Sequence, residues 1–242
     1  LFPYTTLFRS EAAGQWLQAQ GGTLHSGYRV QRIARGPAGS TGWRVDDAPF
    51  DAVVVATTST EAARLVLTAQ TAHPTLQGPE AAALQAWARK AQALRFTAIA
   101  TVYAQTSALP QGTVLSQPML ALRPGAGQPA QFVFDRMQLG GPAGLLAFVV
   151  SASEGDRATL EREVLQQAQD QLGLQGLRIV QTVVEKRATF ACTPALQRPP
   201  QTVANGLCAC GDYVEGPYPA TLEGAVLSGT AAAGTPVAAT MA

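Results

Sequence analysis

The sequence predicts an α/β protein, in which short apolar strands and helices follow one another along the chain. Residues 53–56, VVVA, form a continuous apolar run of the kind that is buried on both faces of a parallel sheet. Residues 207–210 form a second short apolar run, which Gly211 and Asp212 end. Between these runs, strand-like segments alternate with helices and Pro/Gly-rich turns, which favours a mixed or antiparallel sheet with helices on one face.

Length and composition limit the classes of function. A chain of 242 residues can form one large domain or two modest ones. The net charge of +1 predicts no general attraction to nucleic acid. No apolar run reaches the roughly 18 residues that a membrane span needs. The three cysteines fit neither a disulfide framework nor a four-ligand zinc site, so we predict no metal.

Residues 1–10, LFPYTTLFRS, match residue for residue a translation of a common sequencing-adapter oligonucleotide. They lack the long apolar core and the small-residue cleavage site of a signal peptide. We therefore expect residues 1–10 to be an artefact without a fixed structural role, and the natural protein to begin further upstream.

The expected elements can be placed in chain order. The first part predicts a helix over residues 11–20, strands over 23–35, 43–45 and 53–56, and a helix from 60 to about 67 that residues 57–59 cap. Residues 68–79 are loop-like in composition, and we place the crossing into a second domain there. The middle part predicts a helix over 80–94, strands over 96–105, 119–122, 131–134 and 145–151, a helix over 153–172, and a strand over 177–185 with an extended continuation to 194.

Residues 207–229 combine a strand, a glycine turn, an acidic residue and the start of a helix. Pro219 suits a first helical turn, and residues 220–233 have the small side chains of a helix that something flat could approach. This layout can hold a charged or polar ligand against free backbone N–H groups, with Asp212 as the best candidate carboxylate. The alternative is a plain αβ unit, in which Asp212 is a turn or capping residue.

This stretch resembles the C-terminal flavin motif of the FAD-dependent amine oxidase and phytoene desaturase superfamily, where a GD or GE pair precedes a GA…SG helix. The words PATLEGAVLSG are most similar to the squalene-associated FAD-dependent desaturases, or hydroxysqualene dehydroxylases, of hopanoid synthesis. Three further segments resemble that family in their order and spacing: QFVFDR, LLAFVVSAS and EKRATFACTP. The resemblance covers most of residues 11–235.

The resemblance implies part of a Rossmann-like FAD-binding domain, made of residues 11–70 and 203–242, and a substrate domain over residues 71–202. In the family, the valine of a V-x-x-I pattern lies against the adenine, which maps to Val30 with Ile33. Without the resemblance, Val30 is simply a core valine. The cofactor-binding residues that the resemblance implies are Val30, Ala56, Thr57, Gly211, Asp212, Pro219, Ala220, Thr221 and Leu222.

The implied activity is that of an FAD-dependent oxidoreductase acting on an apolar, squalene-type isoprenoid. Hydroxysqualene would lose its hydroxyl as water, and a hydride from reduced flavin would quench the allylic cation to give squalene. An apolar pocket in the substrate domain would bind the hydrocarbon, while no catalytic acid can be assigned. The implied location is cytoplasmic, with peripheral contact to the inner membrane as an option. The alternatives are a carotenoid-type desaturase, an amine oxidase, or an inert truncated piece that binds no ligand.

Two further features qualify this resemblance. Residues 125–130, GAGQPA, satisfy the letters of a dinucleotide fingerprint, but a strand follows where a helix should open, so we predict a turn. The pyrophosphate-binding βαβ unit should therefore lie upstream of Glu11, and we expect residues 11–242 alone to be poorly soluble and to bind no FAD. Asp135 and Arg136 could order an active-site wall or bind a polar substrate end; the alternative is a structural ion pair at a domain seam.

Overall fold

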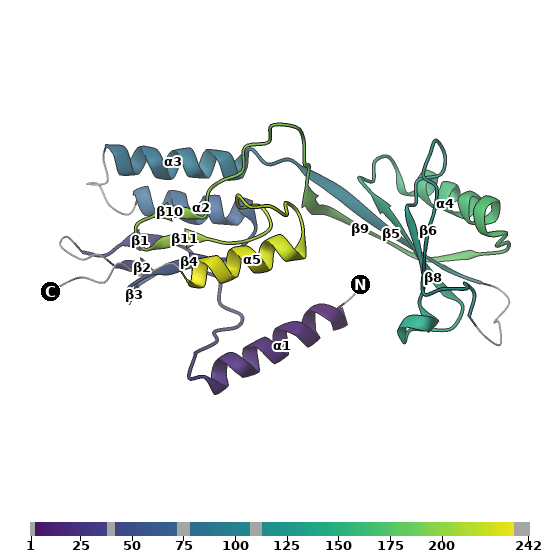
Figure 1. Cartoon of the computed structure of the whole chain (residues 1–242), viewed down its shortest axis with the longest axis horizontal. Coiled ribbons are helices and arrows are strands. Elements are labelled where there is room, and N and C mark those ends of the chain that lie inside the picture. The colour runs from purple at the N-terminus through teal and green to yellow at the C-terminus, as the bar shows by residue number, and fades with distance from the viewer. Residues whose placement is uncertain (1–2, 38–41, 72–77, 107–112, 235–242) are drawn as a thin grey trace. The chain divides into compact units, whose positions relative to one another are not determined.

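The computed structural model describes the backbone of residues 3–37, 42–71, 78–106 and 113–234, and it divides the chain into two compact units (Figure 1). Unit 1 contains residues 1–94 and 192–242, and unit 2 contains residues 95–191. These boundaries differ from the crossing expected between residues 68 and 79. The helix over Pro79–Gln92 (α3) belongs to unit 1, because the Trp87 indole Nε1 donates to the Pro200 carbonyl (2.7 Å).

Unit 1 is built on two small sheets. β1 (Ile33–Arg35), β2 (Trp43–Val45) and β3 (Ala48–Phe50) form an antiparallel meander. β10 (Thr202–Ala204), β11 (Leu207–Ala209) and β4 (Val53–Val55) form the second sheet, in which β11 and β4 run parallel. Figure 1 shows α2 (Ser59–Thr71) and α3 on one side of these strands and α5 (Leu222–Ala233) on the other.

Three expectations for unit 1 require correction. Val30 is not in a strand, because side chains satisfy the backbone there. The Asp46 carboxylate accepts the N–H groups of residues 31 and 32 (3.0 and 2.9 Å), and the Arg64 guanidinium donates to the Val30 carbonyl (2.8 Å). The run 53–55 is not buried on both faces, since the Val54 side chain is 47% exposed beside an edge of its sheet. The short strands β3 and β10 were not expected.

The first helix, α1 (Pro3–Ala19), begins before the expected position at Glu11. Its backbone therefore runs through part of the segment that matches the adapter translation. The side chains of residues 1–10 lie outside the described residues. The expectation that this segment has no structural role stays a prediction.

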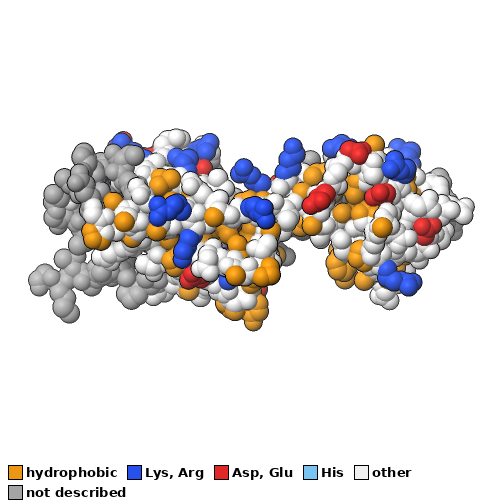
Figure 2. Space-filling model, turned by 90° about the horizontal axis from the view of Figure 1, so that it is seen from above, with side chains coloured by type: hydrophobic (Ala, Val, Ile, Leu, Met, Phe, Trp, Pro, Cys, Tyr) orange, Lys and Arg blue, Asp and Glu red, His pale blue; other side chains and the backbone are white. Residues whose placement is uncertain are grey.

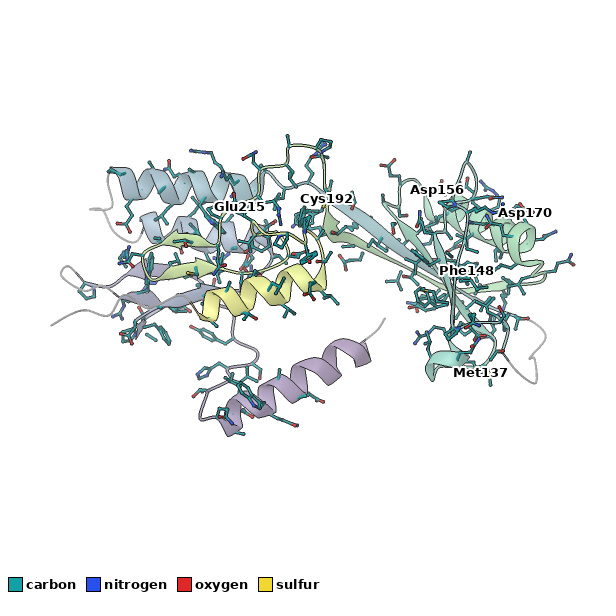
Figure 3. The ribbon with its side chains drawn as sticks, in the orientation of Figure 1. Met137, Phe148, Asp156, Asp170, Cys192 and Glu215 are labelled. Carbon is teal, nitrogen blue, oxygen red and sulfur yellow. The ribbon has the colours of Figure 1, made fainter. Side chains whose placement is uncertain are left out.

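The described part of unit 2 contains a five-stranded antiparallel sheet, an α-helix that packs on it, and a short 3-10 helix (Met137–Leu139). Its strand order is β6 (Met119–Ala121), β7 (Phe132–Asp135), β8 (Leu145–Ser151), β5 (Phe96–Gln105) and β9 (Arg178–Phe190). α4 (Arg157–Leu172) covers one face, where Val102, Val133 and Phe148 meet Leu160 and Val164 in a buried core (Figure 3). The predicted α/β class, with an antiparallel sheet and a helix on one face, is confirmed.

The segment 125–130 is a turn, as predicted. Gly125 and Gln128 exchange two backbone hydrogen bonds (2.9 and 3.0 Å). The fully buried Gln167 of α4 holds this turn, because its side-chain oxygen accepts the Ala130 N–H (2.8 Å) and its amide donates to the Ala130 carbonyl (2.9 Å). On the face shown in Figure 2, charged side chains of both signs are scattered among hydrophobic ones.

A fully buried carboxylate, Asp135, organises the end of β7. It accepts hydrogen bonds from the backbone N–H groups of Val114 (2.8 Å), Leu115 (3.1 Å) and Met137 (3.1 Å), and from the Gln138 amide (3.2 Å). Burial acts to raise the pKa of Asp135, but these hydrogen bonds favour the charged form more, so the pKa lies below its ordinary value. These contacts, all within unit 2, favour a structural role.

We expect Asp135→Asn to lower the free energy of unfolding by about 2 kcal/mol near neutral pH, because the amide cannot replace a carboxylate that accepts several N–H groups. Folding lowers the pKa of Asp135, so its carboxylate stabilises the fold fully at pH values above its unfolded-state pKa, near 3.8. This contribution to the free energy of unfolding is lost as the pH falls through the lower, folded-state pKa. Urea denaturation followed by circular dichroism at neutral and acidic pH measures both effects. The exposed Asp170→Asn is the control, and equal losses in the two variants would contradict the assignment.

Candidate functional site

The ends of β4 and β11 bring two loops together at one edge of the sheet. These strands pair in parallel, with Ala209 opposite Val55, and the Cys210 N–H donates to the Val55 carbonyl (3.0 Å). Parallel strands end at the same edge, so the segments 56–57 and 211–212 leave the sheet at neighbouring positions. In open α/β sheets, ligands bind outside the carboxyl ends of the strands.

A groove of about 410 Å³ opens beside β4. Its lining is mostly aliphatic, with Tyr28, Arg29, Val30, Ile33, Val45, Val53, Val54, Val55, Ala56, Thr57, Glu61 and Leu65 around it. Three of the predicted site residues, Val30, Ala56 and Thr57, therefore share one groove. The other predicted residues lie on the loop and helix that follow β11, outside this lining.

The loop after β11 begins at a residue that only glycine suits. Gly211 has a φ of 152°, and a Cβ there would lie 2.7 Å from the ring of the buried Tyr213. The Gly211 N–H donates to the Ser228 hydroxyl oxygen (2.9 Å), and this hydroxyl lies 3.1 Å from the Gly211 carbonyl. Ser228 thereby ties α5 to the end of β11. The buried Cys208 and Cys210 pack against Ala232 of α5.

The helix α5 begins at Leu222, two positions after the expected start at Ala220. Thr221 is the N-cap, and its Oγ1 accepts the Gly224 N–H (3.0 Å). Ala220 has a left-handed φ of 57°, which cannot continue into a right-handed helix, so Pro219 and Ala220 belong to the loop. Of the first N–H groups of α5, that of Gly224 is capped by Thr221, and those of Leu222 and Glu223 precede the first internal hydrogen bond of the helix, from Ala225 to Thr221.

Asp212 is half-buried at the start of this loop. Burial raises the pKa of its carboxyl, while the backbone N–H groups of Asp212 and Tyr213 and the positive charge of Arg198 oppose that rise. Burial also raises the pKa of the Tyr213 phenol and of the Cys210 thiol. The carboxylate can accept hydrogen bonds from the hydroxyl groups of a ligand, and the neighbouring side chains stay neutral.

Arg198 also shapes this loop, although nothing in the sequence marked it. Its Nη1 donates to the Val214 carbonyl (2.6 Å), and its Nη2 donates to the Gly216 carbonyl. Such a role depends on contacts between segments that only the fold brings together. Within the part of the chain that the structure describes, no group of three or more His, Cys, Asp or Glu side chains could hold a metal ion.

A family model described as flavin containing amine oxidoreductase matches residues 6–235 of the chain. No curated protein matches the chain by sequence. Among the described helices, none has both the length and the hydropathy that crossing a bilayer requires.

Solved structures resemble the chain at low sequence identity, and those with TM-scores of 0.50 or more share its fold. An oxidoreductase from Methanosarcina mazei is 17% identical, with a TM-score of 0.59 over 91% of this chain and 52% of that chain. A protein from Pyrococcus furiosus is 10% identical, with a TM-score of 0.50 over 79% of this chain and 43% of that chain. A putative protoporphyrinogen oxidase from Exiguobacterium sp. 255-15 is 15% identical, with a TM-score of 0.49 over 85% and 46%. The chain spans about half the length of these structures.

Two glycines of α5 test the geometry of the site. A Cβ on Gly224 would lie 2.0 Å from the Tyr218 carbonyl oxygen, whereas a Cβ on Gly229 would meet no atom within 4 Å. We expect Gly224→Ala to lower the stability of unit 1 by about 1–3 kcal/mol through overpacking. Gly229→Ala should raise it by about 0.5–1 kcal/mol, because alanine is the better helix former.

Denaturation followed by tryptophan fluorescence reports on unit 1, because Trp43 and Trp87 are buried there. Similar stabilities for the Gly224→Ala and Gly229→Ala variants would show that α5 does not approach the preceding loop as closely as described.

Proposed function

The chain belongs to the flavin-containing amine oxidoreductase family, and from this premise we propose that it is part of an FAD-dependent oxidoreductase acting on a squalene-type isoprenoid. The finer assignment is reductive dehydroxylation of hydroxysqualene to squalene in hopanoid synthesis. Two observations support this assignment: the sequence segments that resemble that family, and the apolar surface of unit 2.

The residues present fit two parts of FAD. The aliphatic groove with Val30, Ala56 and Thr57 suits a flat adenine ring and its ribose. Asp212, at the end of β11, suits the hydroxyl groups of a ribityl chain. Thr221 and Leu222 stand at the start of α5, where the N–H groups of Leu222 and Glu223 precede the internal hydrogen bonds of the helix and could face a polar ligand. When bound, the flavin supplies the hydride chemistry, and the protein supplies position and electrostatics.

The observation that carries the substrate class is the second face of the unit 2 sheet. α4 packs on the face that presents Val133, Phe148 and Val102. Among the described residues of unit 2, no α-helix packs on the opposite face. The cross-strand register places two rows there, one of Met119, Phe134, Ala147 and Tyr103, the other of Ala121, Phe132, Val149 and Thr101.

This open face, defined by those two rows, is mostly apolar; Ala147 and Tyr103 at its inner end are buried, whereas its residues on β6 and β7 are more exposed. The Met119 side chain is 48% exposed and Phe132 is 39% exposed. A broad apolar surface with few polar groups marks a binding surface for an apolar ligand or partner. A long hydrocarbon gains free energy by covering it, whereas a small charged amine gains little.

The reaction replaces a carbon–oxygen bond by a carbon–hydrogen bond. The hydroxyl leaves as water after taking up a proton, and the hydride completes the new bond. The role we assign to the open face is to hold the hydrocarbon and to keep water away from the carbon that loses its hydroxyl.

The test uses the protein with its upstream sequence, reduced FAD, and hydroxysqualene, phytoene or a simple amine as separate substrates. We expect squalene from hydroxysqualene and no turnover of the other two. Phe132→Asp should raise the KM for hydroxysqualene at least tenfold, because a carboxylate on the open face disfavours an apolar chain, with about 1.4 kcal/mol for each factor of ten.

The control is Gln175→Asp, which adds the same carboxylate at an exposed position away from the open face. Conversion of phytoene or the amine without squalene formation would overturn the substrate assignment. An equal rise in KM for both variants would show that the open face does not bind the hydrocarbon.

A further inference from the structure

Arg198 bridges two carbonyl groups of the loop that follows β11. Its Nη1 lies 2.6 Å from the Val214 carbonyl oxygen, and its Nη2 donates to the carbonyl of Gly216, two residues further on. A guanidinium carries its donors in a rigid planar fork, so one arginine can fix the spacing of two acceptors. A lysine ammonium has the charge but not the fork.

The segment that carries Arg198 is itself anchored to the core of unit 1. The buried Pro199 accepts the Glu215 N–H (3.0 Å), which aligns this segment with the loop. The next residue, Pro200, accepts the indole N–H of the buried Trp87 in α3 (2.7 Å). The guanidinium therefore holds the loop from a fixed support.

The position of this loop determines where the Asp212 carboxylate and the start of α5 lie. The Ala220 N–H donates to the Asp212 carbonyl (3.3 Å), so the two ends of the loop are joined close to Asp212. The positive charge of Arg198 also acts on Asp212, where it opposes the effect of burial on the carboxyl pKa. Arg198 thus acts on Asp212 by geometry and by charge.

We infer that Arg198 is a positioning residue for FAD, which it serves by holding residues 212–216 in the conformation that presents the Asp212 carboxylate and the first N–H groups of α5. This inference rests on the proposed function. Arg198 reaches the cofactor through the loop, and its contribution is to the affinity for FAD.

The test compares Arg198→Lys and Arg198→Ala with a control, Arg32→Ala, which removes an exposed arginine paired with Asp47. In the protein without flavin, both Arg198 variants should lose amide-exchange protection in residues 213–216. In the protein with its upstream sequence, both should raise the Kd for FAD about tenfold, as expected for the loss of charge-assisted hydrogen bonds.

Methylguanidinium at millimolar concentration should restore FAD affinity to Arg198→Ala, while ammonium should not. This rescue separates positioning from a general loss of folding, and Arg198→Lys keeps the inference testable if the alanine variant does not fold. Unchanged exchange in the loop, or unchanged affinity for FAD, would overturn the inference.

The Asp212→Ala variant shows whether only the role of Arg198 is wrong or the proposed function is wrong as well. Weaker FAD binding by Asp212→Ala with normal binding by both Arg198 variants would reject only the role of Arg198. Normal binding by Asp212→Ala as well would reject the loop as part of the flavin site.

Discussion

The parallel pairing of β11 with β4 is the constraint on which the candidate site depends. It joins segments that are more than 150 positions apart in the sequence, 53–55 and 207–209, and makes both strands end at one edge. The aliphatic groove follows from the end of β4, and the loop with Asp212 follows from the end of β11. The packing of Cys208 and Cys210 against Ala232, and the hydrogen bonds of Ser228, then fix α5 beside that loop.

The same arrangement leaves apolar surface in contact with water. The Val54 side chain on β4 is 47% exposed, and α5 exposes Leu222 and Val226 at 74% and 64%. Exposed apolar surface of this kind favours association with another element or ligand.

Sequence patterns predicted those elements whose signals are local. Alternation predicted β5, and the flanking Pro/Gly-rich turns predicted β8, both with their observed bounds; the predicted end of α4 at Leu172, before Gly173, is also as observed. Patterns failed where distant groups decide the structure. Val30 was expected in a strand, but the Asp46 carboxylate and the Arg64 guanidinium satisfy the backbone around it. Sequence patterns could not identify Arg198 as a site residue, because the carbonyl groups that it binds belong to a loop that only the fold brings close to it.

The central claim is that FAD binds across the ends of β4 and β11, and hydrogen–deuterium exchange of the protein with its upstream sequence tests it most directly. Exchange is measured with and without FAD, at a concentration that saturates the site. The account predicts that FAD slows exchange at the amides of residues 30, 56–57, 211–216 and 220–224, and leaves α4 unchanged. Protection confined to other segments, with no change at the ends of β4 and β11, would contradict it.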